Sequence, residues 1–342
     1  MPDSPDAYDP VRRAAADDAD LYDVADWEDR SIVDHVATRL HAFLTTNVEY
    51  ILAVVAVLIL AAQFAIVGVA AVSNPFIAVF TVLSVIPAFF LALVVWKIDV
   101  TIKEPLDLMV VTFLLGFLFA GFAAVVNTML QGVFQVVPLV GMVLFFFLVV
   151  GPVEETVKWL AVRLYAYDSP NFDSVVDGAV YGAIAGLGFA TVENFIYITR
   201  PALQAASTGG GQAALQAALD TAAVRLFAGP GHVIYSAFAG YYLGLAKFNP
   251  GKRGPIVVKG LLVAAVIHAT YNSLVGHVGV LTYFLPIGGG VAYLLFVFVY
   301  DGVFFYILYR KLARYREKYR EYDAGRVDDD FDGLTPAVER VD

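Results

Sequence analysis

Long apolar stretches run through most of this 342-residue chain, and they constrain its fold more than any other feature. A helix needs roughly 20 apolar residues to cross the hydrocarbon core of a bilayer. With 59% hydrophobic and only 16% charged residues, the chain has too few charges to cover the exterior of a soluble domain of this size. The pattern therefore predicts an all-α fold, a polytopic bundle of transmembrane helices with the lipid bilayer as its solvent.

The apolar stretches predict about eight spans. They cover residues 50–72, 76–96, 106–127, 133–166, 175–198, 229–247, 256–275 and 282–309. The fourth stretch is too long for a straight crossing, so Pro138 and the pair Gly151-Pro152 should divide or kink it. The eighth should begin irregularly, because Pro286 and three glycines at 288–290 lie in its first turns.

Basic residues in the connections predict the orientation. They follow the second, fourth, sixth and eighth spans, whereas the short loops after the first, third and seventh carry none. By the positive-inside rule, both termini are expected to be cytoplasmic. The expected location is the plasma membrane, as a multi-pass protein. The Ala-, Gly- and Gln-rich connection at 200–228 would then lie outside, as an amphipathic or a re-entrant element.

Polar tails flank the predicted membrane domain at 46–311. Residues 1–45 are expected to form a disordered acidic segment (1–30) followed by an interfacial helix (31–44), and residues 312–342 a charged cytoplasmic tail. The net charge of −10 lies mainly in these tails, so no nucleic-acid partner is expected. The excess of Asp over Glu and the scarcity of Lys suggest a halophile. The absence of cysteine excludes thiolate chemistry and disulfides.

Ionisable side chains at membrane depth cost at least ~2.5 kcal/mol each, and here they concentrate in spans four to seven. Glu154 and Lys158 are four residues apart, and Glu155 and Lys158 are three apart, so they share a helix face. A lysine can keep one carboxylate charged beside a second that takes up a proton, which suits a general base for water. The alternative is an ion pair that ends the helix at the membrane edge.

Three further polar sets lie on the next spans. They are Glu193 with Asn194, His232 with Ser236, and His268 with Asn272. Glu193 and Asn194 point about 100° apart on a helix, so only one of them can be central to a site. Each histidine has a polar partner one turn further along. The alternative to a functional site is a set of structural hydrogen bonds between helices.

Four other polar residues lie outside these sets. Asp177 is expected to pair with a base such as Lys158, and Asp301 stays unassigned. Arg225 either neutralises a carboxylate or lies in the outer headgroup region. His277 is expected to be solvated in a short outer loop.

Taken in order, the motifs resemble the PrsW family of intramembrane proteases over about residues 140–280. The motifs are Glu154-Glu155-x-x-Lys158, Phe189-x-x-x-Glu193-Asn194, His232-x-x-x-Ser236 and His268-x-x-x-Asn272. That family is similar to the CAAX prenyl endopeptidases and bacteriocin-processing enzymes, which share paired glutamates and a later His-x-x-x-Asn motif. The resemblance implies hydrolysis of a membrane-anchored protein substrate, with the paired glutamates and the last motif at its centre.

The resemblance also suggests a mechanism. Glu154, helped by His232 or Glu193, would polarise a water, while His268 and Asn272 would donate hydrogen bonds to the oxyanion. Glu155 and Lys158 would set orientation and charge.

A metal variant is equally open, with Glu193, His232 and His268 as three ligands of Zn²⁺. Counting depth along the helices puts Glu193 and His232 in the outer half of the membrane and Glu154 deeper, which a kink at Pro152 or a water-filled cavity must reconcile.

Two other classes of protein fit part of the pattern. Buried carboxylates and histidines also form proton relays, so a proton- or ion-coupled transporter or channel is the main alternative. A catalytically silent scaffold with the same fold is the other. Transport without cleavage products would distinguish the first from a protease.

Overall fold

The computed structural model describes residues 30, 32–73, 75–99 and 103–332. Every regular element within these ranges is a helix, which confirms the predicted all-α class. In this described part, five helices are long and apolar enough to cross a membrane. They are Pro75–Ile98, Leu106–Gln135, Val175–Lys247, Pro250–Val275 and Gly289–Arg320. The chain is thus a helical membrane protein, whereas the count of eight spans and the orientation stay predictions.

The chain divides into two units, Met1–Val55 and Ala56–Asp342. Helix α2 (Ile32–Ser73) begins in the first unit and ends in the second. No helix end separates the predicted interfacial helix from the predicted first span, because neither proline nor glycine occurs between Ile32 and Val67. The segment expected to be disordered, apart from its last residue, lies outside the described residues.

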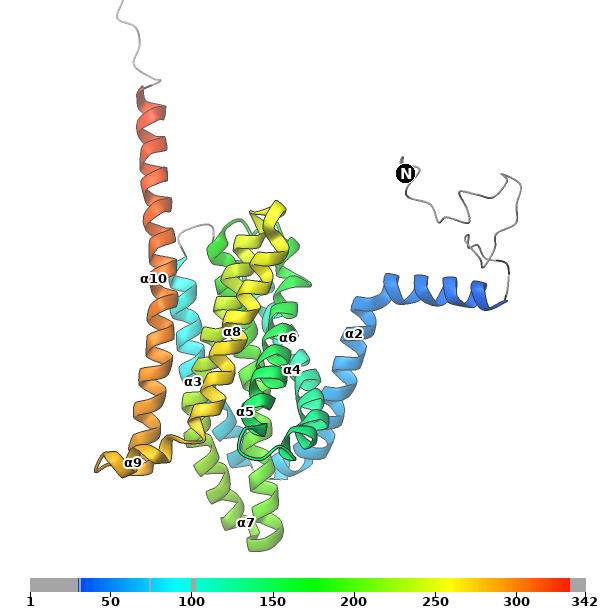
Figure 1. The fold of residues 1–342 in the computed structure, drawn as a ribbon, viewed down its shortest axis with the longest axis vertical. Helices are drawn as coiled ribbons and strands as arrows, with labels where there is room; N and C mark the ends of the chain where they lie inside the picture. Colours follow the sequence, from blue (N-terminus) through cyan, green and yellow to red (C-terminus); the bar gives the residue numbers. More distant parts are fainter. Residues whose placement is uncertain (1–29, 31, 74, 100–102, 333–342) are drawn as a thin grey trace, which may run out of the picture. The chain divides into compact units, whose positions relative to one another are not determined.

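In the second unit, α3 (Pro75–Ile98), α4 (Leu106–Gln135) and α8 (Arg253–Val275) follow the predicted spans closely. The short α9 (Leu281–Phe284) and the break at Pro286 precede α10 (Gly289–Asp332), which confirms the irregular start predicted there. Figure 1 shows α3, α8 and α10 running roughly parallel. Helix α10 continues through much of the predicted tail.

The predicted fourth span is interrupted twice. A turn with Leu139 at φ 65° separates α4 from α5 (Gly141–Phe145), and a π-helix, η2 (Phe146–Val150), then leads into α6 (Gly151–Arg163). Pro152 has no N–H to donate to the preceding turn, so the regular α-helical bonding is interrupted just before it and resumes in α6. The division near Pro138 and the irregularity at Gly151-Pro152 are therefore as predicted.

The predicted fifth and sixth spans are the two arms of one element, α7 (Val175–Lys247). The arms meet at Gly210, whose φ of 72° and ψ of −167° are not helical. The connection at 200–228 is thus neither a loop nor a separate element but the helical continuation of both arms. Figure 1 shows the resulting hairpin extending beyond the ends of the neighbouring helices.

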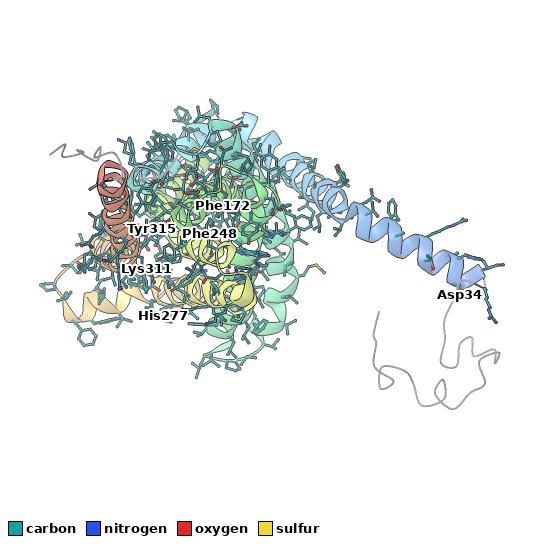
Figure 2. The ribbon with its side chains drawn as sticks, turned by 90° about the horizontal axis from the view of Figure 1, so that it is seen from above. Asp34, Phe172, Phe248, His277, Lys311 and Tyr315 are labelled. Atoms are coloured by element: carbon teal, nitrogen blue, oxygen red, sulfur yellow. The ribbon has the colours of Figure 1, made fainter. Side chains whose placement is uncertain are left out.

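The two arms of α7 pack closely because small residues face each other. A Cβ atom added to Gly186 would lie 2.4 Å from the backbone oxygen of His232. Gly182 and Gly178, one and two turns earlier, approach the second arm in the same way. Such small residues at four-residue spacing allow helix backbones to touch in membranes. Large side chains fill the rest of the bundle, where Phe172 lies inside and His277 at the edge (Figure 2).

Candidate active site

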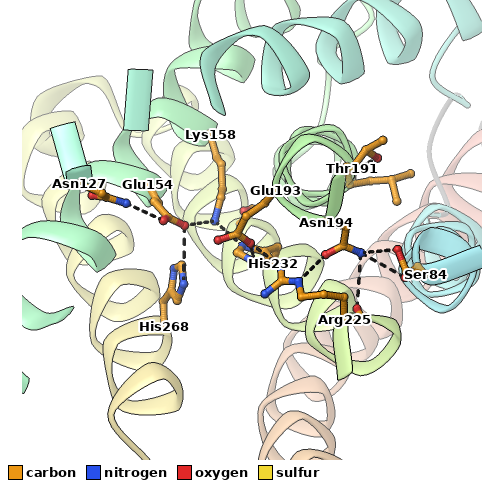
Figure 3. A network of polar contacts seen from close by, with 12 residues as sticks. Ser84, Asn127, Glu154, Lys158, Thr191, Glu193, Asn194, Arg225, His232 and His268 are labelled. Atoms are coloured by element: carbon orange, nitrogen blue, oxygen red, sulfur yellow. Dashed lines mark hydrogen bonds and ion pairs between the residues drawn. The ribbon is translucent and has the colours of Figure 1, made fainter. Parts of the chain in front are cut away.

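Four ionisable side chains from three helices converge on one cavity of about 560 Å³. Glu154 comes from α6, Glu193 and His232 from the two arms of α7, and His268 from α8. Figure 3 shows them side by side, in one network with Lys158. The structure therefore brings together residues up to 114 positions apart, counted from Glu154 to His268.

Close backbone contacts hold the contributing helices in place. A Cβ atom added to Gly151 would lie 2.6 Å from the backbone oxygen of Ala265, so the start of α6 touches α8 just before His268. The contact of Gly186 with His232 fixes the two arms of α7 in the same way. Together with the π-helix before α6, these contacts bring Glu154 to the same cavity as the polar residues of α7.

Glu155 lies behind the cavity and is fully buried. Its Oε1 atom is 2.7 Å from Nζ of Lys158 and 2.8 Å from Nδ1 of His268. Its Oε2 atom accepts a hydrogen bond of 3.3 Å from the hydroxyl of Ser236. A charged, fully bonded carboxylate of this kind orients its neighbours rather than reacting itself.

His232 is held at both ring nitrogens. Nδ1 lies 2.9 Å from Nζ of Lys158, and Nε2 lies 2.6 Å from Oε2 of Glu193. An ammonium group can only donate, so Nδ1 accepts and the imidazole proton belongs on Nε2, where it is donated to Glu193. The ring of Phe189 covers Lys158, with Nζ 4.2 Å from the ring centre.

Glu154 is the carboxylate with bonding capacity left. Its Oε1 atom accepts a hydrogen bond of 3.0 Å from Asn127, while Oε2 is buried and has no hydrogen bond to any described residue. Oε2 lies 3.7 Å from Nε2 of His268 and 3.8 Å from Nζ of Lys158. Because the Nδ1 proton of His268 is directed at Glu155, Nε2 presents a lone pair beside this oxygen.

The charges of the site do not balance. Glu154, Glu155 and Glu193 face the cations Lys158 and Arg225, and both imidazoles are neutral in the bonding pattern above. One negative charge remains uncompensated, and burying such a charge is costly. A proton or a bound cation at Glu154 would remove the excess.

A second polar network fixes Glu193 from the side. Arg225 donates to Glu193 over 2.6 Å and to Oδ1 of Asn194 over 2.7 Å, and Asn194 donates to Ser84 on α3 over 2.9 Å. Glu193 thus belongs to the cavity and Asn194 to the support behind it. Arg225 neutralises a carboxylate, which decides between its two predicted places.

Residues 104–303 match the family described as "PrsW family intramembrane metalloprotease". The matched region is more than half of the chain and includes every helix of the site. The chain belongs to the PrsW family.

Proteins called Protease PrsW are similar over a shorter region. The one from Geobacillus kaustophilus is 34% identical over 129 residues, covering 37% of this chain and 50% of that protein. The one from Shouchella clausii is 30% identical over 133 residues, 39% and 55% of the two chains. The one from Bacillus subtilis is 31% identical over 129 residues, 37% and 52%. The chain spans about half the length of these relatives, and no solved structure matches it.

Within this PrsW-family site, one predicted pairing is wrong. Lys158 bonds to Glu155 and His232, not to Asp177. Asp177 instead caps the start of α7, where its side chain accepts hydrogen bonds from Ser174. It lies 16 residues before Glu193, roughly 24 Å away along a helix.

The other predicted polar residues have clear places. Asn272 lines the cavity, and its side chain makes no hydrogen bond to another described residue. Asp301 accepts a hydrogen bond of 2.9 Å from Tyr235, whose ring packs against His268. His277 is exposed in a turn, with Nδ1 2.8 Å from the backbone oxygen of Ser273.

The residues fit a zinc ion, although with a different carboxylate from the one predicted. Ligand atoms of Glu154, His232 and His268 lie within 4.8 Å of one another. Two histidines and one carboxylate are a known zinc set, and Glu155 would hold His268 as carboxylates hold zinc-binding imidazoles. The unbonded Oε2 atom of Glu154 is suited to coordinate the ion. To bind the ion, His232 would have to give up its contact with Glu193, which would stay paired with Arg225.

Sequence reasoning missed Asn127. This residue ends the predicted third span and donates to Glu154 from α4. A lone amide in a strongly apolar helix was the available signal, because amides at membrane depth need a partner.

Proposed function

We propose that this member of the PrsW family is an intramembrane endopeptidase that hydrolyses peptide bonds of membrane-anchored proteins. One observation carries the proposal: Glu154 presents a buried, unbonded oxygen beside the lone pair of His268, at the wall of a cavity between apolar helices. Two adjacent proton acceptors of this kind suit the activation of a water molecule.

The reaction would begin with a water bound by Oε2 of Glu154 and Nε2 of His268. Glu154 takes one proton as the water oxygen bonds to the carbonyl carbon of the substrate. The carbonyl oxygen becomes an oxyanion, to which the amide of Asn272 donates a hydrogen bond. When the C–N bond breaks, the proton on Glu154 passes to the leaving nitrogen, giving a carboxylic acid and an amine.

This assignment changes the expected role of His268. A donor to the oxyanion needs a proton on Nε2, but the contact with Glu155 holds the single proton of the neutral ring on Nδ1. His268 therefore serves as an acceptor for the water. Glu155 and Lys158 would keep the part expected of them, since Glu155 contacts His268 and Lys158 contacts His232.

A zinc ion held by Glu154, His232 and His268 would supply Lewis-acid activation of water and carbonyl. The uncompensated negative charge of the site and the open lone pairs of Glu154 and His268 support this addition. Whether or not the ion is bound, Asn127 orients Glu154 through its other oxygen.

The substrate is proposed from the position of the cavity. Apolar and aromatic residues of α4, α5 and α7 line it together with the polar site. A transmembrane segment of another protein, locally unwound, would present its peptide carbonyl to such a cavity. We place the enzyme in the plasma membrane with both termini cytoplasmic, as the basic connections suggest.

Reconstitution tests this function against transport. The full chain is placed in liposomes with fluorescent single-span proteins of varied transmembrane sequence, and the products are identified by mass spectrometry. A protease cuts at least one of them within or next to its membrane segment. Ion or proton flux through the same liposomes, with every protein left intact, would overturn the proposal in favour of a transporter.

A further inference from the structure

Three carboxylates gather at the start of α7, far from the candidate active site. Asp99 follows the end of α3, Glu104 lies two residues before α4, and Asp177 is in the first turn of α7. The ligand oxygens of these side chains lie within 4.8 Å of one another. None of the three contacts the network around Glu154 in any described interaction.

All three side chains are withdrawn from solvent. Asp99 is 4% exposed, Glu104 3% and Asp177 0%. Asp177 accepts hydrogen bonds from the backbone N–H groups of Asp173 and Ser174, and these bonds also anchor the start of α7. Its position at the cluster is therefore fixed by the helix cap and does not depend on the other two carboxylates.

Glu104 is the group that the helix packing does not explain. Both of its carboxylate oxygens are buried, and neither has a hydrogen bond to any residue that the structure describes. A buried polar group without partners is rare in proteins, because leaving it unbonded costs the full desolvation free energy. This side chain is directed at two further carboxylates, so the missing partner must be positively charged or carry a proton.

The nearby cation does not fill this place. Lys103 is nearly half exposed, and its Nζ atom lies 3.8 Å from the Asp99 carboxylate, beyond hydrogen-bond distance. Its hydrogen bonds go instead to the backbone oxygens of Trp96 and Asp99.

We propose that Asp99, Glu104 and Asp177 bind a hard divalent cation of the Mg²⁺ and Ca²⁺ class, which ties the connection between α3 and α4 to the start of α7. Oxygen-only ligands favour these ions over zinc, which prefers nitrogen and sulfur. Tyr181 lies one turn after Asp177 on the same face, and its buried hydroxyl has no hydrogen bond to a described residue. It offers a further oxygen. The site is separate from the proposed zinc ligands.

Terbium luminescence tests the site directly in the purified full chain. Tb³⁺ replaces Ca²⁺ at oxygen sites, and Tyr181 on the next turn is suited to sensitise its emission. The wild-type protein should show saturable emission that Ca²⁺ or Mg²⁺ displaces. Glu104→Gln should weaken the binding at least tenfold, because it removes one charged ligand without changing the shape of the side chain.

Asp107→Asn is the matched control. Asp107 is an exposed carboxylate in the first turn of α4, three residues from Glu104, and lies outside the cluster. It should bind Tb³⁺ as the wild type does. Thermal unfolding after removal of cations checks that Glu104→Gln is folded, and Ca²⁺ should then raise the Tm of the wild type but not of this variant.

Two results would overturn the proposal. One is the absence of saturable Tb³⁺ binding together with a wild-type Tm that Ca²⁺, Mg²⁺ and Mn²⁺ leave unchanged, which would mean that a proton on Glu104 completes the cluster. The other is equal binding by the wild type and Glu104→Gln. Neither result depends on proteolysis, so failure here leaves the proposed active site untouched.

Discussion

His268 and Glu155 are joined by a contact of 2.8 Å between Nδ1 and Oε1, and both side chains are almost completely buried. This contact determines which nitrogen of His268 carries the proton and so leaves Nε2 open toward Glu154. Glu155, a residue of the first motif, thereby sets the chemistry of the fourth motif, 113 residues later.

The first prediction concerns this contact. Glu155→Gln should lower kcat about 10–100-fold with little change in KM, because the amide can hold the ring but cannot supply the negative charge. Ser236→Ala removes only a 3.3 Å bond to the same carboxylate and should cost less than about threefold. Steady-state kinetics with a cleaved membrane substrate give both values. Equal activity of Glu155→Gln and wild type would contradict the role given to this carboxylate.

The second prediction concerns the approach of α6 to α8. Gly151→Ala should destabilise the fold by about 1–3 kcal/mol, since the new methyl group meets the backbone oxygen of Ala265 and neither helix can yield easily. Activity should fall with it, because Glu154 moves away from His268. Gly132→Ala on α4 is the control: nothing lies within 4 Å of its added Cβ. Thermal unfolding in detergent should show a lower Tm for the first variant alone.

The third prediction concerns zinc. The purified chain should hold about one zinc per molecule, and both Glu154→Gln and His268→Gln should lose most of it. The exposed His277 offers a control, since His277→Gln should keep the metal. Elemental analysis by mass spectrometry measures the content, and cleavage should stop with a chelator and return with added zinc. Full cleavage by a zinc-free preparation would show that Glu154 and His268 act alone.

The fourth prediction concerns pH. The pKa of Glu104 is raised from 4.5 to about 8 in the folded chain, first by burial and then by Asp99. The folded state therefore holds this proton more tightly than the unfolded state, so the stability it contributes is complete below pH 4.5 and is lost as pH rises through 8. Without divalent cations, Tm should fall between pH 5 and 9, and the free energy of unfolding should fall by up to about 1.4 kcal/mol per pH unit.

Glu104→Gln should flatten this dependence, because the amide does not titrate. The charged groups facing Glu104 are Asp99, Asp177 and Lys103, and they stay in place in the variant. A bound cation favours the ionised carboxyl, so it should also reduce the fall in Tm. The same pH profile for variant and wild type without cations would contradict the assignment.

Sequence reasoning predicted the polar residues of the cavity more accurately than it predicted the helices that carry them. Composition and spacing identified Glu154, Glu193, His232 and His268, because ionisable residues are conspicuous among apolar ones. The sequence did not predict that the fifth and sixth spans form one hairpin, because alanine, glycine and glutamine at 200–228 are equally compatible with loop and helix.

Contacts across the bundle were beyond the reach of a linear pattern. From the sequence, Glu154, Glu155 and Asp177 are all candidate partners of Lys158. Only the packing of α6 against α7 shows that Lys158 bonds to Glu155 and not to Asp177. The support of Glu154 by Asn127 depends on α4 lying beside α6. Gly151 and Gly186 marked where helices could touch, but not which backbone each would meet.

The most direct test of the account is the rate of cleavage by Glu154→Gln. The substitution keeps the size of the side chain and one oxygen for the hydrogen bond from Asn127, while it removes the proton acceptor. Glu317→Gln, at an exposed position of α10, is the control for the same chemical change. The substrate is a single-span protein that the wild type cuts, and circular dichroism and Tm verify the fold of both variants. The account predicts that kcat/KM falls at least a thousandfold for Glu154→Gln and stays within twofold for Glu317→Gln; cleavage by folded Glu154→Gln at the wild-type rate would contradict it.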